Sequence, residues 1–464
     1  MGVEGKADLR WPPFARQNQC SADASRASGA RAPRAPPVAG TVPIMFLDSL
    51  LALGLVLATA TQLRFGDTPF GPGEMCLVLW LGLLLCLQPL RPAPTSNVAF
   101  AHVAAFWLIL IVAESVGAIV GFATEPFFDT THTLHDVIAF SFTFWVACTM
   151  ALELANERRR RRLTWLVVLF GAASLSLQMA QAYGLIGLPL PVDPWFYDRL
   201  KGWSQDANQL GLVSALLTVI SIHIAITATG HAKAKIVAAA ACAVVAFSVG
   251  VLSKSDSFTV GMLVAGAVFL AVQCSAWLAT FKRAVTFRAT LASLALLGLP
   301  VLAVGALPLA PAAMDRVEAK SDALYNEDSQ GDLRFALWAE AYEKGMAAGM
   351  LGLGPGPHLT KTKSWKLPPP AKFEVHNTPL DLFVQGGLLA LLDIALLYAS
   401  LILATMRARL PALAALSCAF VVFSMFHFII RHPIFWFGVV LCFLEAASVS
   451  KPSLGGKHAD VARP

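Results

Sequence analysis

Long apolar segments constrain this chain most strongly. About twelve stretches reach the length, roughly 20 residues, that an α-helix needs to cross the hydrocarbon core of a bilayer. Of the 464 residues, 56% are hydrophobic and only 14% are charged. The sequence therefore predicts an all-α, polytopic membrane protein. The expected spans cover residues 45–63, 74–90, 98–121, 134–153, 163–183, 208–229, 235–252, 257–280, 289–311, 379–402, 410–430 and 433–448.

Basic residues gather in alternate connections between these spans. Such a bias marks the cytoplasmic side, so both termini are expected there as well. The formal net charge is +6, but the cations occur in short topogenic clusters, and we therefore predict no nucleic-acid partner. The arginine run at 158–162 is interpreted in the same way and implies no site. The clusters are Arg91, Arg158 to Arg162, Lys233 with Lys235, Lys282 with Arg283 and Arg288, and Arg407 with Arg409.

The same pattern divides the chain into segments. The first 43 residues are rich in Arg, Ala and Pro and cannot bury much surface, which is typical of a disordered tail. Because the apolar pattern begins abruptly at Met45, we expect translation to start there instead of at Met1. The predicted segments are a basic, Pro-rich tail (1–43), spans one to nine (44–311), a large periplasmic loop with an amphipathic helix (312–378), spans ten to twelve (379–448) and a cytoplasmic tail (449–464).

Metal and cofactor sites are not expected. The eight cysteines stand singly, most of them inside apolar runs, without the spacing of a zinc, redox or disulfide site. Gly352, Gly354 and Gly356 lack the preceding strand and the following Gly-Lys-Ser/Thr of a nucleotide loop, so a turn is the better interpretation. His427 and His432 would bind a metal only with ligands from elsewhere.

Basic residues on the opposite face run against the topogenic rule. They lie in the loop 184–207, the turn 253–257, the long segment 312–378 and the turn 431–433. A negatively charged ligand at the outer membrane surface would explain them. These residues are Arg199, Lys201, Lys254, Arg334 and Arg431.

The long outer segment contains a predicted amphipathic helix at residues 332–349. Leu333, Leu337, Trp338 and Ala341 have helical spacing, and Arg334 precedes Trp338 by four residues. The Gly- and Pro-rich tract 352–357 must end this helix.

His376 and Asn377 then open the next span. Asn377 or Thr378 can cap that helix, and Pro379 suits its first turn. His376 is therefore expected at the outer mouth of a membrane helix. Gly386 and Gly387 lie about three turns deeper, where the absence of side chains would let another helix approach closely.

Several motifs taken together resemble those of the O-antigen ligase and polysaccharide polymerase family of bacterial inner membranes. They are R334-x3-W338, the G-x-G of 352–354, H376-N-T-x-L380 and the glycine pair 386–387, with R199-L-K-G-W-S-Q-D-A-N208 and L252-S-K-S-D-S257 before them. The resemblance covers residues 160–440. The chain departs from the family pattern with Ala207 in place of Pro, Lys254 in place of Arg and Ala390 in place of Gly.

This resemblance implies transfer of a glycan from an undecaprenyl diphosphate carrier to an acceptor sugar hydroxyl, at the periplasmic face and without nucleotide, cofactor or metal. The implied partners are the lipid-linked oligosaccharide donor, a glycan or lipid-core acceptor, the lipid bilayer and a chain-length regulator. His376, Arg334 and Arg199 would be the catalytic residues. The implied substrate-binding residues are Lys201, Asn208, Lys254, Trp338, Asn377, Asp381 and Arg431.

The residues themselves agree with that chemistry. Guanidinium groups bind phosphate oxygens bidentately and Lys acts as a point charge, so both stabilise a diphosphate leaving group. His376 would take the proton of the acceptor hydroxyl or hydrogen-bond the diphosphate, and the sequence leaves both roles open. Asp381 follows His376 by five residues and thus lies well round the helix, so it is expected instead to neutralise a basic residue.

Other interpretations stay open. Arg199 and Lys201 fit solvated loop charges, Arg334 with Trp338 fits an interfacial anchor, and Asn377 with its neighbour fits a helix cap. Glu114, inside the third span, fits either a functional or a structural partner. Among functions, the turn at 253–256 favours a polymerase over an O-antigen ligase. A transporter or flippase of lipid-linked glycans, a metal-dependent multispan glycosyltransferase and a structural assembly subunit are the remaining alternatives.

Overall fold

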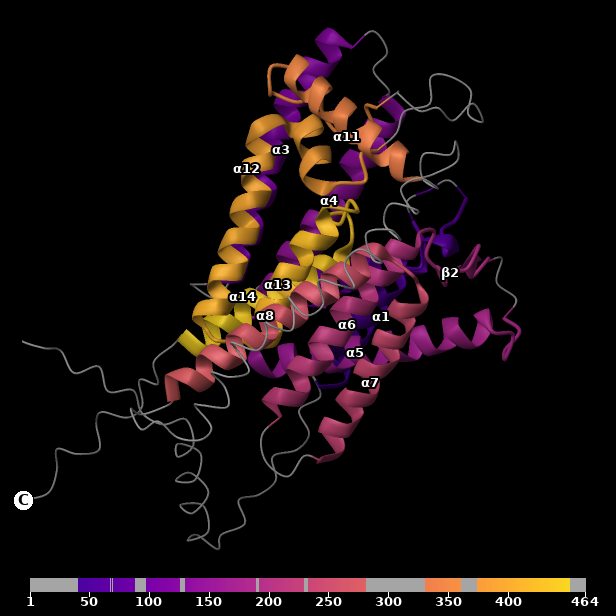
Figure 1. The fold of residues 1–464 in the computed structure, drawn as a ribbon, viewed down its shortest axis with the longest axis vertical. Coiled ribbons are helices and arrows are strands. Elements are labelled where there is room, and N and C mark those ends of the chain that lie inside the picture. Colours follow the sequence, from indigo (N-terminus) through magenta and orange to yellow (C-terminus); the bar gives the residue numbers. More distant parts are fainter. Residues whose placement is uncertain are drawn as a thin grey trace, which may run out of the picture. The chain divides into compact units, whose positions relative to one another are not determined.

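The computed structural model describes residues 41–66, 68, 70–87, 97–125, 130–188, 192–228, 233–280, 330–359 and 374–450. The chain forms two compact units, 1–46 and 47–464, and all contacts below lie within the second. The described part contains twelve α-helices, a short 3-10 helix η1 (Thr61–Leu63) and one two-stranded hairpin (Figure 1). The predicted all-α class is confirmed.

Seven of the described helices are long and apolar enough to cross a membrane, and four shorter apolar helices accompany them. A multi-pass membrane protein is thereby confirmed. The expected span at 289–311 lies outside the described residues, while each other expected span coincides with one helix. The long helices are α3 (Val98–Thr124), α4 (Thr130–Glu153), α5 (Glu157–Ala182), α6 (Ala207–Thr227), α7 (Lys233–Leu252), α8 (Asp256–Thr280) and α12 (Thr378–Arg407); the shorter ones are α1 (Thr41–Leu57), α2 (Pro72–Leu87), α13 (Pro411–Ser424) and α14 (Pro433–Ser450).

Helix α6 lies deepest in the second unit. In its apolar window 78% of the residues are buried, and it packs against α5, α7, α8 and α13. Large aromatic side chains fill the neighbouring core, where the Trp107 and Trp436 rings lie 5.0 Å apart. Because α6 runs the length of this core, residues at its two ends belong to two different surfaces of the bundle.

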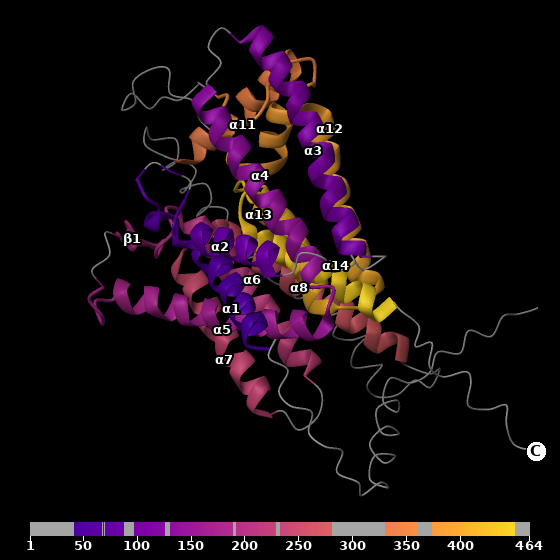
Figure 2. The ribbon, with the colours of Figure 1, turned by 180° about the vertical axis from the view of Figure 1, so that it is seen from behind.

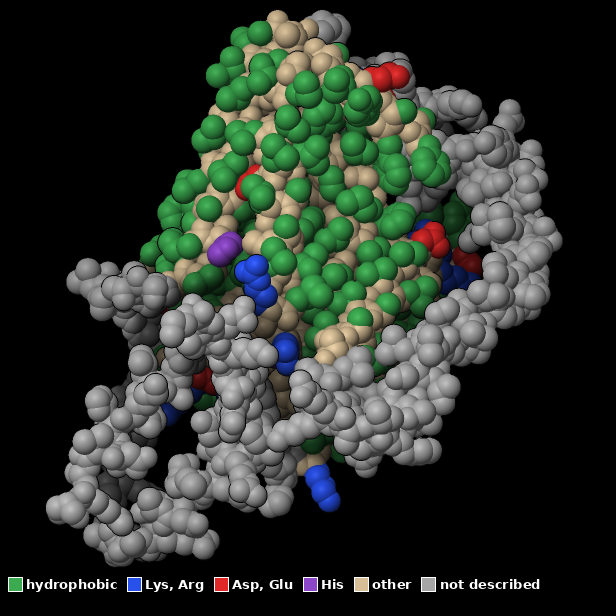
Figure 3. Space-filling model, turned by 60° about the vertical axis from the view of Figure 1, so that its left-hand side comes forward, with side chains coloured by type: hydrophobic (Ala, Val, Ile, Leu, Met, Phe, Trp, Pro, Cys, Tyr) green, Lys and Arg blue, Asp and Glu red, His purple; other side chains and the backbone are tan. Residues whose placement is uncertain are grey.

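Helices α3 and α12 lie side by side in both ribbon views (Figures 1 and 2). Their outward side chains include exposed Leu108, Val112, Leu392 and Leu396. The space-filling view shows a described surface dominated by such hydrophobic side chains, with few charged ones (Figure 3). An apolar outer surface of this extent suits contact with lipid.

The arginine run at the start of α5 is a packing element as well as a topogenic signal. Arg159 and Arg160 are buried, which their interpretation as a topogenic charge run did not include. The Nε of Arg159 donates to Asp48 Oδ1 at 2.6 Å, and Arg162 binds the same carboxylate. The Nε of Arg160 donates to Glu445 Oε1 at 2.7 Å. These pairs join α5 to α1 and α14.

The predicted amphipathic helix is α11 (Gln330–Ala347). Leu337 and Ala341 are buried in a small cluster that also contains Val375 and Val384. The glycine tract that follows forms a loop, with Gly352 and Gly354 at φ +87° and +89°, so the predicted turn is confirmed. The location of α11 at the membrane interface stays a prediction.

Helix α12 breaks at Gly387, whose φ and ψ are 67° and −158°. The loop after α11 fills the break: Leu388 N donates to Met350 O at 2.9 Å, and Gly354 N donates to Gln385 O at 2.8 Å. A Cβ on Gly387 would lie 2.1 Å from Met350 O. Close approach at this glycine was expected from another helix, and a loop backbone makes it instead. At Gly386 the neighbour is Ala113 of α3, as expected, 3.1 Å from the position of a Cβ.

Candidate functional site

Polar residues converge where α6 and α12 begin. Four connecting segments meet there: the hairpin of β1 (Trp195–Phe196) and β2 (Arg199–Leu200), the turn 253–255, residues 374–377, and residues 425–432 between α13 and α14. Hydrogen bonds and ion pairs link these segments. We call the set the polar cluster; it comprises Asp136, Arg199, Asp206, Asn208, Ser255, Glu374, His376, His427, Arg431 and His432.

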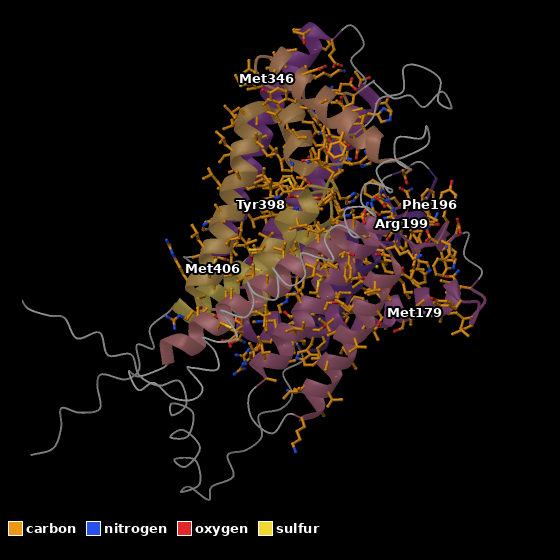
Figure 4. All side chains as sticks on the ribbon, viewed as in Figure 1. Met179, Phe196, Arg199, Met346, Tyr398 and Met406 are labelled. Atoms are coloured by element: carbon orange, nitrogen blue, oxygen red, sulfur yellow. The ribbon has the colours of Figure 1, made fainter. Side chains whose placement is uncertain are left out.

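The hairpin supplies Arg199 to this cluster; Figure 4 labels it beside Phe196 of β1. Trp195 pairs with Leu200 across the two strands, and its Nε1 donates to Ala182 O at 2.9 Å, which fixes the hairpin to the end of α5. Arg199 itself is half-buried and held by two long contacts of 3.4 Å, to Ser253 O and to Asn208 Oδ1. Its guanidinium therefore keeps most of its hydrogen-bonding capacity for another anion.

Asn208 lies at the start of α6 and is buried. Its Oδ1 accepts from Ser255 Oγ at 2.7 Å, so it ties α6 to the turn at 253–255. Asp206 caps α6, and its Oδ1 accepts from the Asn208 backbone N–H at 3.0 Å. The predicted substrate-binding Asn208 is thus a central connector of the polar cluster.

The two predicted lysines lie at the rim. The Nζ of Lys254 lies 2.5 Å from Asp198 Oδ2, with 56% of the side chain exposed. That pairing lowers the pKa of Asp198, through the hydrogen bond first and the charge of Lys254 second. Lys201 lies 3.4 Å from Asp193. Exposed pairs of this kind contribute little to stability.

A histidine pair continues the cluster from Asp206. His427 Nδ1 lies 3.9 Å from Asp206 Oδ2, and its Nε2 lies 3.2 Å from His432 Nε2. Burial lowers the pKa of His432 well below the ordinary value of 6.5, and the nearby charges of His427, Arg64 and Arg431 act in the same direction. For Asp206, burial alone would raise the pKa, but the charge of His427 and the Asn208 N–H lower it on balance.

The start of α12 is built by its own polar residues. Asn377 Oδ1 accepts from Leu380 N at 3.1 Å, so the predicted cap is confirmed. No basic side chain among the described residues pairs with Asp381, contrary to expectation; its carboxylate accepts from the backbone N–H groups of Val375 at 2.9 Å and Asn377 at 3.4 Å. Thr378 Oγ1 donates to His427 O at 2.6 Å, which joins α12 to the histidine pair.

Arg431 lies in the most densely charged part of the cluster. Its two terminal nitrogens each lie 2.5 Å from a carboxylate, Glu374 on one side and Asp136 of α4 on the other. Burial would lower the pKa of Arg431, but these two carboxylates raise it further above its ordinary value. Burial likewise opposes ionisation of Glu374, and the charge of Arg431 lowers its pKa on balance. Arg431 is thus already neutralised.

His376 is exposed at the mouth of α12, in the left-handed region at φ +55°. Its charge acts on both Asp206 and Glu374, so it lies between the two halves of the cluster. Arg334 belongs to α11, and its side chain lies outside the described residues. Trp338, one turn further along, packs on the same small cluster as Leu380, and its Nε1 has no hydrogen-bond partner among the described residues.

Two buried features adjoin Arg431. A cavity of about 80 Å³ is lined by Arg431, Arg64, Glu74 and His135, among others. Glu114 of α3 is buried, and its Oε1 lacks a hydrogen-bond partner among the described residues. Within the described part of the chain, no group of three or more His, Cys, Asp or Glu has the arrangement of a metal site.

Several members of the polar cluster were not predicted from the sequence as functional residues. Asp206 and Glu374 each stand two residues before a predicted site residue, Asn208 and His376, and that spacing is the signal that was available. Asp136 lies within a predicted apolar span, and its neighbours in the sequence gave no sign of a functional role. His427 and His432 were considered only as metal ligands, whereas they contact each other and approach a carboxylate.

Comparison with known proteins supplies independent evidence. Residues 241–392 match the family model described as O-antigen ligase. The matched stretch begins inside α7 and ends inside α12, so it contains Lys254, Arg334 and His376, while Arg199 and Arg431 lie outside it. No curated protein matches the chain.

Proposed function

We propose that this polytopic membrane protein, whose residues 241–392 match the O-antigen ligase family, is a polysaccharide polymerase. In this proposal, a glycan linked to undecaprenyl diphosphate is transferred to a sugar hydroxyl on another lipid-linked repeat. The proposal assigns the polar cluster to the periplasmic face of the bacterial inner membrane, where the reaction would take place without a metal ion.

The convergence of cations and histidines at the starts of α6 and α12 carries this proposal. The family-like segments 199–208 and 376–380 meet through His427, which lies 3.9 Å from Asp206 Oδ2 and whose carbonyl accepts from Thr378 Oγ1 at 2.6 Å. A donor diphosphate needs cations, and an acceptor hydroxyl needs a proton acceptor. The polar cluster offers both kinds of group at one end of the helices.

Arg199 is the residue best suited to bind the diphosphate. Its present contacts are long, so exchanging them for phosphate oxygens costs little, and a charge-assisted bidentate contact gains more than it loses. Arg334 would bind the same group from α11. Arg431 has a different role, because two carboxylates already hold it, and we assign it to fixing the 425–432 segment beside α12.

The proposed reaction forms one bond and breaks another. The acceptor hydroxyl oxygen attacks the anomeric carbon of the donor glycan, and the bond from that carbon to the diphosphate oxygen breaks. The hydroxyl proton passes to the imidazole of His376, which is exposed at the mouth of α12. The cations stabilise the charge that develops on the departing diphosphate.

The resemblance of the turn at 253–256 to exopolysaccharide polymerases favours polymerase over ligase. Deleting the gene and separating surface glycans and undecaprenyl-linked intermediates by size tests this choice. A polymerase predicts single repeats in place of long chains. Long chains stranded on the carrier would instead establish a ligase, and unchanged glycans would refute the proposal.

Complementing the deletion with variants tests the residues. His376→Ala and Arg199→Ala should not restore long chains, although immunoblots show the wild-type protein level. Two matched controls remove the same residue types at the other end of the helices: Arg158→Ala on α5 and His102→Ala on α3. Both controls should restore the glycan, and equal failure of all four variants would contradict the assigned roles.

A further inference from the structure

A second pocket lies at the opposite ends of the helices that form the polar cluster. It measures about 320 Å³ and is bounded by the first half of α5, the end of α6, the start of α7 and the end of α14. Along α6, His223 of this pocket is fifteen residues from Asn208, or about 22 Å at the rise of an α-helix. The pocket is therefore separate from the polar cluster, and the family motifs do not account for it.

Cations dominate the lining of this pocket. Arg161, Arg162 and Lys235 line it, against one carboxylate, Glu445. The Glu445 carboxylate is already bound by Arg160, which lies outside the lining. Lys235 is exposed, and none of the described residues pairs with it. Outside the lining, Glu157 pairs with Arg161 and Asp48 pairs with Arg162, so the unpaired positive charge of the pocket is that of Lys235.

A buried histidine gives a second, independent sign of a ligand. His223 lines the pocket one turn deeper along α6 than Thr227, with only 6% of its surface exposed. Its Nδ1 is buried and has no hydrogen-bond partner among the described residues. An unpaired polar atom at such a depth costs free energy unless a ligand or water satisfies it.

The remaining lining is apolar or amphipathic. Trp165 is half-buried, and Ile224 and Leu441 are also part of the wall. Tryptophan is enriched at the level of lipid head groups, and basic pockets between membrane helices bind anionic head groups. A free anion would gain nothing from these apolar side chains, whereas the glycerol and the first acyl carbons of a lipid would pack against them.

We propose that this pocket binds the phosphate of an anionic phospholipid from the adjacent leaflet. Arg161, Arg162 and Lys235 contact the phosphate oxygens, and the imidazole of His223 hydrogen-bonds the deeper part of the head group. The lipid thereby joins the ends of α5, α6 and α7 on the face opposite the polar cluster. This site is independent of which glycan reaction the protein catalyses.

Native mass spectrometry of the full-length protein in a neutral detergent tests the site, with phosphatidylglycerol and phosphatidylcholine as probes. Wild-type protein should bind phosphatidylglycerol saturably and in preference to phosphatidylcholine. Removing two cations in Arg161→Ala/Lys235→Ala should weaken that binding by about tenfold to thirtyfold, at roughly 1 kcal/mol for each cation. The control Arg158→Ala/Lys233→Ala loses the same charge from exposed positions outside the pocket and should bind like the wild type.

His223 variants and inorganic phosphate provide two further readouts. His223→Gln, which keeps a hydrogen-bonding side chain, should bind phosphatidylglycerol more tightly than His223→Phe. Partial displacement of the lipid by inorganic phosphate would support recognition through the phosphate. Binding of inorganic phosphate without any saturable lipid binding would overturn the lipid assignment. Equal loss of binding in the two double variants would overturn the site itself.

Discussion

The two ends of the helices both contain arginines that are buried or half-buried, but these arginines have different partners at each end. At the end where α5 begins, called the basic end below, consecutive residues of α5 supply the cations. Asp48 and Glu445 neutralise the buried ones, Arg159 and Arg160. At the end with the polar cluster, Arg199 and Arg431 come from different loops and contact residues far away in the sequence. The basic end is thus a local charge run that also packs, whereas the polar cluster is assembled by the tertiary fold.

The number and closeness of a charged side chain's partners indicate whether that charge stabilises the fold. The carboxylate of Asp48 is fully buried and serves two arginines, so its removal would leave the buried Arg159 with Glu153 alone and take from Arg162 its partner among the described residues. Arg199 is only loosely bound, so its removal leaves little unsatisfied. We therefore expect mutations at the basic end to affect stability, and mutations at Arg199 to affect activity.

The largest expected effect comes from Asp48→Ala. Breaking a buried pair by removing one partner costs about 3–5 kcal/mol, because an uncompensated charge stays buried. Thermal unfolding of the detergent-purified protein, followed by fluorescence size-exclusion chromatography, should show a large drop in Tm. Glu157→Ala is the control, because its pair with Arg161 is exposed and should contribute little. Similar Tm values for the two variants would contradict the claim that the buried pair stabilises the protein more than the exposed pair does.

At the end with the polar cluster, substitution of a glycine should lower stability more than substitution of a charged residue. Gly387→Ala places a Cβ against Met350 O in a backbone conformation that L-residues rarely adopt, which costs about 1–3 kcal/mol or more. The same Tm measurement detects it. Gly82→Ala in α2 is the matched control, because its Cβ would meet open space, and its Tm should not fall.

Arg199→Ala tests whether this loosely bound arginine contributes to activity and not to stability. Losing a charged hydrogen bond to the diphosphate costs about 1.5–3 kcal/mol, or roughly tenfold to hundredfold in rate. Transfer from purified lipid-linked donor should fall by that factor with Tm unchanged. Lys254→Ala removes an exposed rim cation and should have a smaller effect on rate. A drop in Tm for Arg199→Ala would make it a structural residue like Arg159.

The smallest expected effect concerns pH. Because the folded protein lowers the pKa of His432 below 6.5, the unfolded chain binds a proton there more readily. The free energy of unfolding should therefore fall as pH decreases through 6.5. His432→Gln removes this contribution, so its Tm should change less between pH 7.5 and about 5.5 than that of the wild type.

Sequence patterns predicted the helices closely because a membrane span is a local property. Eleven described helices coincide with expected spans, since a run of apolar residues must bury its backbone polar groups in its own helix. The Asn377 cap and the turn at 352–356 were predictable for the same reason. Residue type and immediate neighbours determine such features.

Only the tertiary structure decided what each polar side chain contacts. His427 was visible in the sequence, but its approach to Asp206 depends on the packing of α6, α12 and α13. Asp381 was expected to meet a basic residue, and the fold turns it to backbone N–H groups instead. Apolar periodicity determines where a helix begins and ends. The pairing of charges between helices depends on distances that no local pattern contains.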